Sequence, residues 1–145
     1  MSVNGQAYIV GDRAGSLAHY PHARRAGPYI YVSGISSRRP DNTYEGATQR
    51  EDGTWALDIS AQTRAILENL KAILNEAGAS LAHVVDLTVF LVDMADYDGF
   101  NQVYNQYFDA ETGPTRTTVA VKQLPCKPPN RLLIEIKAVA LAPDA

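Results

Sequence analysis

Residues 58–80, DISAQTRAILENLKAILNEAGAS, decide the fold class because their apolar residues repeat with the period of a helix. One face of that helix would carry Ile59, Ile66, Leu67, Leu70, Ile73, Leu74 and Ala77. Asp58 precedes the stripe as a helix N-cap, and Gly78 follows it where a residue of left-handed conformation commonly ends a helix. The period then changes, because HVVDLTVFLV (residues 83–92) alternates in the manner of a strand.

The rest of the chain predicts further strands and a second helix. AYIV at 7–10 indicates a short strand, and PHARRAGPYIYVSG at 21–34 indicates two strands around a Gly-Pro turn. Residues 35–55 are polar and rich in turn formers, which predicts a long loop with room for a small hairpin. Residues 95–109 predict a second amphipathic helix, and residues 116–121 and 131–141 predict two closing strands. No internal repeat is evident.

This order predicts an α+β protein in which two helices cover one face of a mixed sheet. The last predicted strand, RLLIEIKAVAL, fits that arrangement, because one side carries Leu132, Ile134, Ile136, Ala138 and Ala140. Its other side mixes apolar and charged residues, namely Leu133, Glu135, Lys137 and Val139. Since no third helix is predicted for this second face, we expect a homo-oligomer whose sheet faces meet. The length of 145 residues predicts one domain, residues 1–145.

Composition excludes several classes of protein. A net charge of −3 and a pI of about 5.5 give no basic surface of the kind that binds nucleic acid. No apolar run approaches the roughly 20 residues of a membrane span, and the N-terminus lacks the features of a signal peptide. The single cysteine, Cys126, excludes an internal disulfide. We therefore expect a cytoplasmic protein that binds neither nucleic acid nor membrane.

Two charged residues of the closing strands are candidate site residues. Arg116, at the entrance of GPTRTTVAV (residues 113–121), is either an edge-strand arginine in a surface ion pair or a clamp for a carboxylate or phosphate. Glu135 either pairs with Lys137 or a neighbouring strand, or is a partly buried carboxylate with a raised pKa that transfers protons. If the two closing strands form a hairpin, Arg116 and Glu135 lie near each other and form a small active site.

The remaining candidates lie in loops. Arg38 and Arg39 are either solvated charges or a second anion contact at the mouth of a site. His19 and His22 have a spacing that can suggest a metal site, but the chain has no further ligand at suitable spacing except Cys126. For this cluster, a role of Tyr20 as an aromatic that lines a substrate pocket is the better explanation. No base is evident beside Cys126, which argues against a nucleophile. Glycine-rich cofactor motifs are absent, so we expect no cofactor.

Four stretches resemble the reactive-intermediate deaminase family, RidA or YjgF, over nearly the whole length of the chain. They are YIYVSG (29–34), the block of residues 61–108, GPTRTTVAV (113–121) and LIEIKAVA (133–140). The resemblance implies a chorismate-mutase-like α+β fold. It also implies a homotrimer, or a multiple of one, whose sheets meet around a central barrel, with sites in the three clefts between subunits.

The same resemblance implies roles for individual residues. Arg116 would bind the substrate carboxylate, and Glu135 would contact the catalytic water. Tyr20 would line the pocket, and Ser33 and Gly34 would lie beside the substrate. No cofactor and no metal is implied.

Where the sequence departs from the family pattern, it resembles one branch of the family, the 2-aminomuconate deaminases of aromatic degradation. Thr118 stands where many members have a cysteine, and the loop that carries Arg38 and Arg39 is longer and more basic than usual. The implied substrate is a dicarboxylate, converted to 4-oxalocrotonate (2-oxohex-3-enedioate) and ammonia. Arg38 or Arg39 would hold the distal carboxylate, and Thr118 would contact the amine or the water. The alternatives are a general deaminase of 2-aminoacrylate-type enamines, a non-catalytic trimer that binds 2-oxo acids, and an RNA-cleaving protein.

Overall fold

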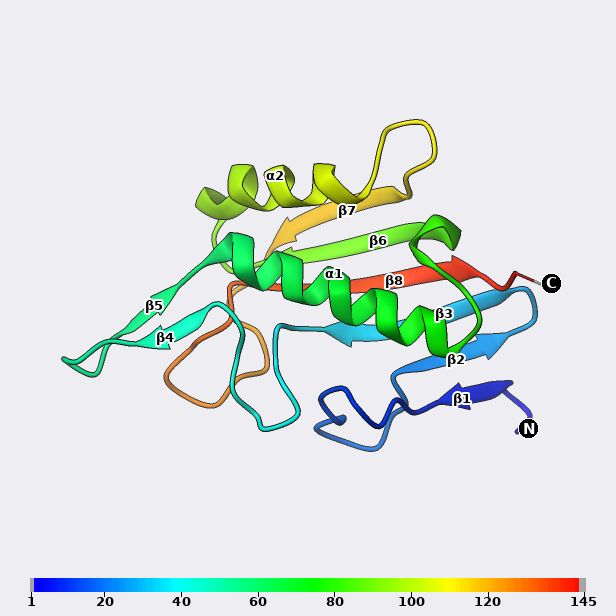
Figure 1. The fold of residues 1–145 in the computed structure, drawn as a ribbon, viewed down its shortest axis with the longest axis horizontal. Coiled ribbons are helices and arrows are strands. Elements are labelled where there is room, and N and C mark those ends of the chain that lie inside the picture. Colours follow the sequence, from blue (N-terminus) through cyan, green and yellow to red (C-terminus); the bar gives the residue numbers. More distant parts are fainter. Residues whose placement is uncertain (1, 144–145) are drawn as a thin grey trace.

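The computed structural model describes residues 2–143 and shows a mixed six-stranded sheet with both α-helices on one face (Figure 1). The strands are β1 (Gln6–Tyr8), β2 (Ala23–Ala26), β3 (Tyr29–Ile35), β6 (Val84–Leu91), β7 (Thr115–Ala120) and β8 (Ile134–Leu141). They lie in the order β1-β2-β3-β8-β6-β7. The helices are α1 (Ile59–Glu76) and α2 (Tyr97–Tyr107), and short 3-10 turns, η1 (Leu81–His83) and η2 (Met94–Asp96), precede β6 and α2. The predicted α+β class is confirmed.

Helix α1 packs on the sheet through the stripe that its sequence predicts. Its Ile66, Leu67, Leu70, Ile73 and Leu74 are buried in the core between helix and sheet. The side chain of Asp58 accepts a hydrogen bond from the backbone N–H of Ala61 at 3.1 Å, which caps the helix as expected. Gly78, with φ of 82°, turns the chain after the helix. No helix within residues 2–143 has both the length and the apolar character of a membrane span.

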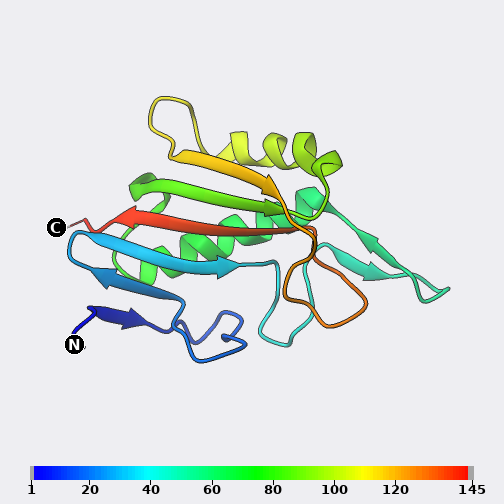
Figure 2. The same ribbon diagram turned by 180° about the vertical axis from the view of Figure 1, so that it is seen from behind.

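Strand β8 lies in the middle of the sheet, between β3 and β6. Its even-numbered residues from Ile134 to Ala140 are buried beneath the helices, whereas the odd-numbered residues from Glu135 to Leu141 point to the other face. That second face carries no helix among the described residues, as Figure 2 shows. It exposes the large side chains Tyr29, Tyr31, Val119 and Leu141. The alternation predicted for this strand is therefore confirmed.

The closing strands do not form the expected hairpin, and this prediction was wrong. Strand β7 pairs in parallel with β6, and β6 pairs with β8, so one strand separates Arg116 from Glu135. Helix α2 connects β6 to β7, and a helical crossover is the connection that parallel strands need. Arg116 is level with Leu87, whose side chain is in the core beneath the helices, while Glu135 is level with Phe90 on the opposite face. The two charged side chains thus leave the sheet on opposite sides.

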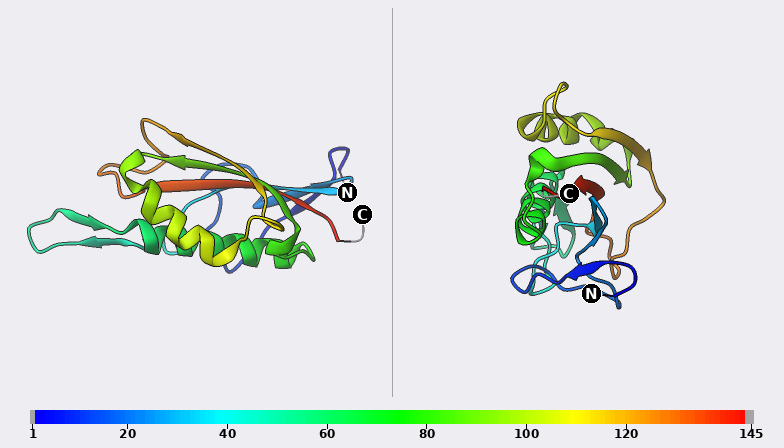
Figure 3. Two further views of the ribbon diagram at one scale, coloured as in Figure 1. Left: turned by 90° about the horizontal axis from the view of Figure 1, so that it is seen from above. Right: turned by 90° about the vertical axis from the view of Figure 1, so that its right-hand side faces the viewer.

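The long polar loop contains a hairpin, β4 (Ala47–Gln49) and β5 (Trp55–Leu57), which projects beyond the end of the sheet (Figures 1 and 3). Two turns of this region share the pattern Arg-x-Asp-[Asn/Gly]-Thr-aromatic, at residues 39–44 and 50–55. In both turns the aspartate accepts from the threonine N–H at 2.9 Å and from the threonine hydroxyl at 2.6 Å. This short repeat was not predicted from the sequence.

The aromatic residues that end the two turns meet on one cation. The guanidinium carbon of Arg131 lies 4.8 Å from the ring centre of Tyr44 and 5.4 Å from that of Trp55. The same side chain donates hydrogen bonds to the carbonyls of Pro129 and Lys127, each at 3.3 Å. Arg131 therefore fastens the proline-rich connection between β7 and β8 to the base of the hairpin.

Candidate functional site

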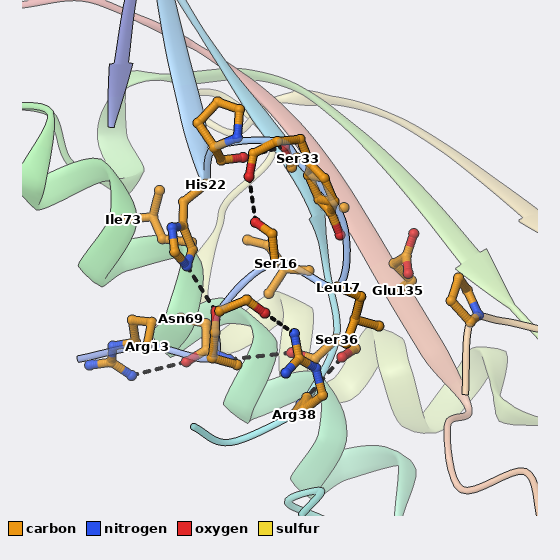
Figure 4. Close-up of a pocket in the computed structure, with 17 residues that line it drawn as sticks. Arg13, Ser16, Leu17, His22, Ser33, Ser36, Arg38, Asn69, Ile73 and Glu135 are labelled. Atoms are coloured by element: carbon orange, nitrogen blue, oxygen red, sulfur yellow. Dashed lines mark hydrogen bonds between the residues drawn. The ribbon is translucent and has the colours of Figure 1, made fainter. Parts of the chain in front are cut away.

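A cavity of about 460 Å³ lies between the loop that follows β1, the end of β3, strand β8 and helix α1 (Figure 4). Its wall brings together five of the residues that the sequence analysis selected, namely Tyr20, Ser33, Gly34, Arg38 and Glu135. The pairing of β3 with β8 explains this proximity. The register shifts between Val32 and Ile35, so Ser33 and Gly34 form an irregularity beside the end of β8 that carries Glu135.

Among residues 2–143, Glu135 is the only acidic residue in the wall of this cavity. Burial raises the pKa of its carboxyl group, because the charged form loses contact with water. Within residues 2–143 no hydrogen bond or ion pair reaches this carboxylate, so the pairing with Lys137 that we considered is not formed. A Cβ atom at Gly34 would lie 2.5 Å from Glu135 Oε2, which shows why a glycine stands here: the carboxylate rests against the Gly34 backbone. These properties suit a group that transfers protons.

The loop that closes one side of the cavity is held by His22. Its Nδ1 accepts the backbone N–H of Val10 at 3.1 Å, so Nε2 carries the proton and donates to the carbonyl of Ala14 at 2.8 Å. Ser33 donates its hydroxyl to the carbonyl of Pro21 at 2.8 Å and fastens the same loop. Since both ring nitrogens are engaged, His22 has a structural role. Residues 2–143 contain no group of three or more His, Cys, Asp or Glu residues that could hold a metal ion.

The two neighbouring arginines of the basic loop separate in the structure. Arg38 lines the cavity and donates to Asn42 Oδ1 at 2.7 Å and to the carbonyl of Gly15. Arg39 is exposed, is not part of this wall, and forms an ion pair with Glu45. Of the two alternatives that the sequence left for the distal carboxylate, the structure therefore places only Arg38 in the same cavity wall as Glu135.

Arg116 projects from β7 toward α2, where aromatic side chains surround it. Its guanidinium carbon lies 4.7 Å from the ring centre of Tyr104 and 4.9 Å from that of Phe100. Nη1 donates to Asn101 Oδ1 at 2.8 Å, and Nη2 donates to the hydroxyl of Tyr97 at 3.0 Å. No carboxylate within residues 2–143 pairs with this arginine, in contrast to the surface ion pair that we considered. A fixed guanidinium with free N–H groups can bind a carboxylate through two bonds.

Thr118 lies with Arg116 and away from Glu135. It is level with Val89, a residue of the core beneath the helices, so its side chain leaves the same face of β7 as Arg116. Its hydroxyl is buried without a hydrogen-bond partner in the described part of the chain. The candidate residues thus form two groups on one chain: a cavity around Glu135 and an aromatic cluster around Arg116.

Both groups lie within the part of the chain that matches a known family. Residues 10–142 match the sequence profile described as endoribonuclease L-PSP, which covers the RidA, YjgF and RutC proteins. The chain belongs to this RidA family. It is 42% identical over 124 residues to the 3-aminoacrylate deaminase RutC of Acinetobacter baylyi, covering 86% of this chain and 87% of the relative. It is 39% identical over 129 residues to the Escherichia coli protein named "putative reactive intermediate deaminase TdcF", covering 88% of this chain and 89% of the relative.

Solved structures of the RidA family agree with the fold. The crystal structure of Escherichia coli TdcF with bound serine matches with a TM-score of 0.75 and 30% sequence identity, covering 94% of this chain and 98% of that one. The RidA-type fold that the sequence predicts is confirmed.

Four residues of this RidA-family site were missed by the sequence analysis. Tyr97 and Asn101, which hold Arg116, lie four residues apart on α2, and that spacing was available in the sequence as a polar pair on one side of the helix. Arg13 and Asn69 line the cavity, and Arg13 Nη1 donates to Asn69 Oδ1 at 2.9 Å. No local pattern connects residues 56 positions apart, so only the folded chain reveals this second pair.

Proposed function

We propose that this protein is a hydrolytic deaminase that converts an enamine, through its imine tautomer, to a 2-oxo acid and ammonia. The observation that carries the proposal is the Glu135 carboxylate, which faces a cavity, rests on Gly34 and has a raised pKa. A carboxyl group of this kind exchanges protons closer to neutral pH than an ordinary glutamate does. The names of the RutC and TdcF relatives, both called deaminases, support the same reaction class.

The proposed reaction begins with protonation of the enamine at carbon, which gives the imine. Water then adds to the carbon of the C=N bond, and Glu135 accepts a proton from this water. The resulting carbinolamine receives a proton on nitrogen from Glu135. As the C–N bond breaks and ammonia leaves, the carbinol hydroxyl loses its proton and becomes the carbonyl of the 2-oxo acid. The imine carbon is already electrophilic, so the steps use no cofactor. One water is consumed for each ammonia released.

The proposal gives Arg116 the carboxylate next to the reacting carbon. Its guanidinium has no acidic partner in residues 2–143 and is fixed by Asn101 and Tyr97, so it can orient an incoming carboxylate. On one chain, however, Arg116 and Glu135 leave opposite faces of the sheet. A ligand that touches both groups therefore requires two chains. We propose a homotrimer, or a multiple of one, in which the exposed second face of the sheet is the contact surface.

For the substrate we propose 2-aminomuconate, which carries a carboxylate at each end. The position of Arg38 in the same wall as Glu135 supports this choice, because a second cation is then available to a ligand that spans the cavity. Hydrolysis converts this substrate to 2-oxohex-3-enedioate and ammonia. A substrate with a single carboxylate, such as 2-aminoacrylate, would leave the charge of Arg38 without a partner on the ligand.

The experiment measures ammonia release after each enamine is generated enzymatically in the presence of the protein. We expect the wild-type protein to accelerate ammonia release from 2-aminomuconate more than from 2-aminoacrylate, and Glu135→Gln to abolish both accelerations. Equal acceleration of both substrates would indicate a general enamine deaminase. If neither reaction is accelerated, the protein is not a deaminase of this class.

A further inference from the structure

Two guanidinium groups line the cavity without an acidic partner. Arg13 and Arg38 are both half-buried in its wall, and within residues 2–143 neither forms an ion pair. In the described part of the chain, the only acidic residue of the wall is Glu135. A surplus of positive charge in a partly buried site favours an anionic ligand, because neither cation is neutralised by the protein itself. This surplus lies in a protein whose net charge is −3.

A closed circuit of hydrogen bonds holds the two arginines in this wall (Figure 4). Arg13 donates to Asn69 Oδ1 at 2.9 Å, and Asn69 donates to the carbonyl of Ser36 at 3.3 Å. The hydroxyl of Ser36 accepts the backbone N–H of Arg38 at 3.2 Å. Arg38 in turn donates to the carbonyl of Gly15, in the loop that carries Arg13. Contacts from the N-terminal loop, α1 and the loop after β3 thus fix the positions of both arginine side chains.

The circuit uses neutral oxygens only, so it leaves both positive charges uncompensated. Arg13 also has a buried Nε–H that finds no acceptor among the described residues. An unpaired donor on a buried cation is unfavourable, and a carboxylate oxygen of a ligand would relieve both the charge and the missing bond. Arg39 is the contrasting case, because its charge is paired with Glu45 and it lies outside this wall.

We infer that Arg13 and Arg38 form a subsite for a second anionic group of the ligand, and that Asn69 positions Arg13 within it. The inference rests on the proposed function for the end of the ligand that reacts. Such a subsite gives the cavity a specificity for small dicarboxylates over monocarboxylates of the same length. This specificity depends on Arg13 as well as on Arg38, the arginine that the sequence already indicated.

The test is a binding experiment with two unreactive ligands, trans,trans-muconate and sorbate. Both have six carbons and the same two double bonds, and they differ in that a methyl group of sorbate replaces the second carboxylate. Titration calorimetry of the full-length protein should show muconate binding roughly tenfold or more tightly than sorbate, as expected for charge-assisted hydrogen bonds. Arg13→Gln, Arg38→Gln and Asn69→Asp should each bring the ratio of the two dissociation constants close to one. In Asn69→Asp the new carboxylate neutralises Arg13.

Arg39→Gln is the matched control, because it removes a neighbouring arginine that is exposed and paired. It should keep the wild-type ratio, as should Arg64→Gln, and circular dichroism should show that all five variants are folded. A ratio near one in the wild-type protein would overturn the inference. So would a loss of the ratio in Arg39→Gln or Arg64→Gln, since those residues line an adjacent hollow and not this cavity. Because neither ligand reacts, the result is independent of whether the protein releases ammonia.

Discussion

The carboxyl group of Glu135 is proposed to transfer protons, and its charged form also lowers the stability of the fold. A substitution can separate these two effects. Burial raises its pKa, so the folded chain holds this proton more tightly than the unfolded chain does. The free energy of unfolding therefore falls as the pH rises from the ordinary pKa of a glutamate through the raised one. Glu135→Gln removes this loss. We expect its melting temperature to exceed that of wild type above this window, and the difference to fade below it.

Thermal melts from about pH 4 to about pH 8 measure this effect, because they span the range of shifted carboxyl groups. Ammonia release by the same variant should fall by roughly 100-fold or more, the size of a lost general acid–base group. A variant that is less stable than wild type throughout the range would show that Glu135 makes a stabilising contact, contrary to our account.

Gly34 is predicted to be important for activity although it carries no charge. A methyl group at this position would lie 2.5 Å from Glu135 Oε2, so Gly34→Ala must displace the carboxylate. We expect a loss of ammonia release of at least roughly tenfold with little change in the urea midpoint, because the glutamate side chain can move aside. Gly11→Ala is the control, since a Cβ there has no atom within 4 Å. Full activity in Gly34→Ala would mean that the position of this carboxylate is not critical.

At the scale of elements, the two similar turns act together through Arg131. Its guanidinium lies over both Tyr44 and Trp55 and bonds two carbonyls of the proline-rich connection. We expect Arg131→Ala to lower the free energy of unfolding by roughly 1–2 kcal/mol, the sum of two cation–π contacts and lost packing. Urea unfolding followed by tryptophan fluorescence measures this, since Trp55 is the only tryptophan.

The control for this prediction is Lys127→Ala. The side chain of Lys127 is exposed, and only its backbone carbonyl accepts from Arg131, so its unfolding midpoint should equal that of wild type. An unchanged midpoint in Arg131→Ala would show that the hairpin and the connection are held by other contacts.

The elements themselves could be predicted because each has a local signal. The apolar stripe of α1 and the alternation in β8 depend only on residues a few positions apart, so the type of element and its buried face follow from the sequence. The neighbours of β7 could not be predicted in this way. Two consecutive strands usually pair, and nothing within residues 115–141 indicates that β6 lies between them.

The candidate site could likewise be predicted only in part from the sequence. Tyr20, Arg38 and Glu135 were selected from the residue pattern and Ser33 and Gly34 through the family resemblance, and all five line one cavity. Arg38 and Arg39 have the same side chain and adjacent positions, so only the turn at residues 39–44 decides which one faces the cavity. The pairing of residues far apart in the chain, such as Arg13 with Asn69, depends on the tertiary structure alone.

For the whole molecule, the separation of Arg116 from Glu135 predicts complementation between inactive variants. Arg116→Ala and Glu135→Ala should each be inactive. If every site takes its arginine from one chain and its glutamate from another, a mixture of both variants contains sites with two intact groups. Random mixing after joint unfolding and refolding should restore up to roughly a quarter of wild-type ammonia release per site.

The control is each variant refolded alone, which should stay inactive. Light scattering on the same samples should show a trimer or a multiple of it. A mixture that remains inactive although the chains have exchanged would mean that one chain supplies both groups. A stable monomer at micromolar concentration would exclude a shared site altogether.

The central position of β8 has a consequence for how the protein is made. While the ribosome adds residues up to Ala120, five of the six strands of the sheet already exist, but they belong to two groups, β1-β2-β3 and β6-β7, that share no hydrogen bonds. Strand β8 joins both groups, so the facing edges of β3 and β6 stay unpaired until Leu141 has left the ribosome. Unpaired strand edges invite association with other chains. Newly made chains should therefore depend on chaperones until the last strand is inserted, and a chain interrupted before Ile134 should aggregate rather than fold.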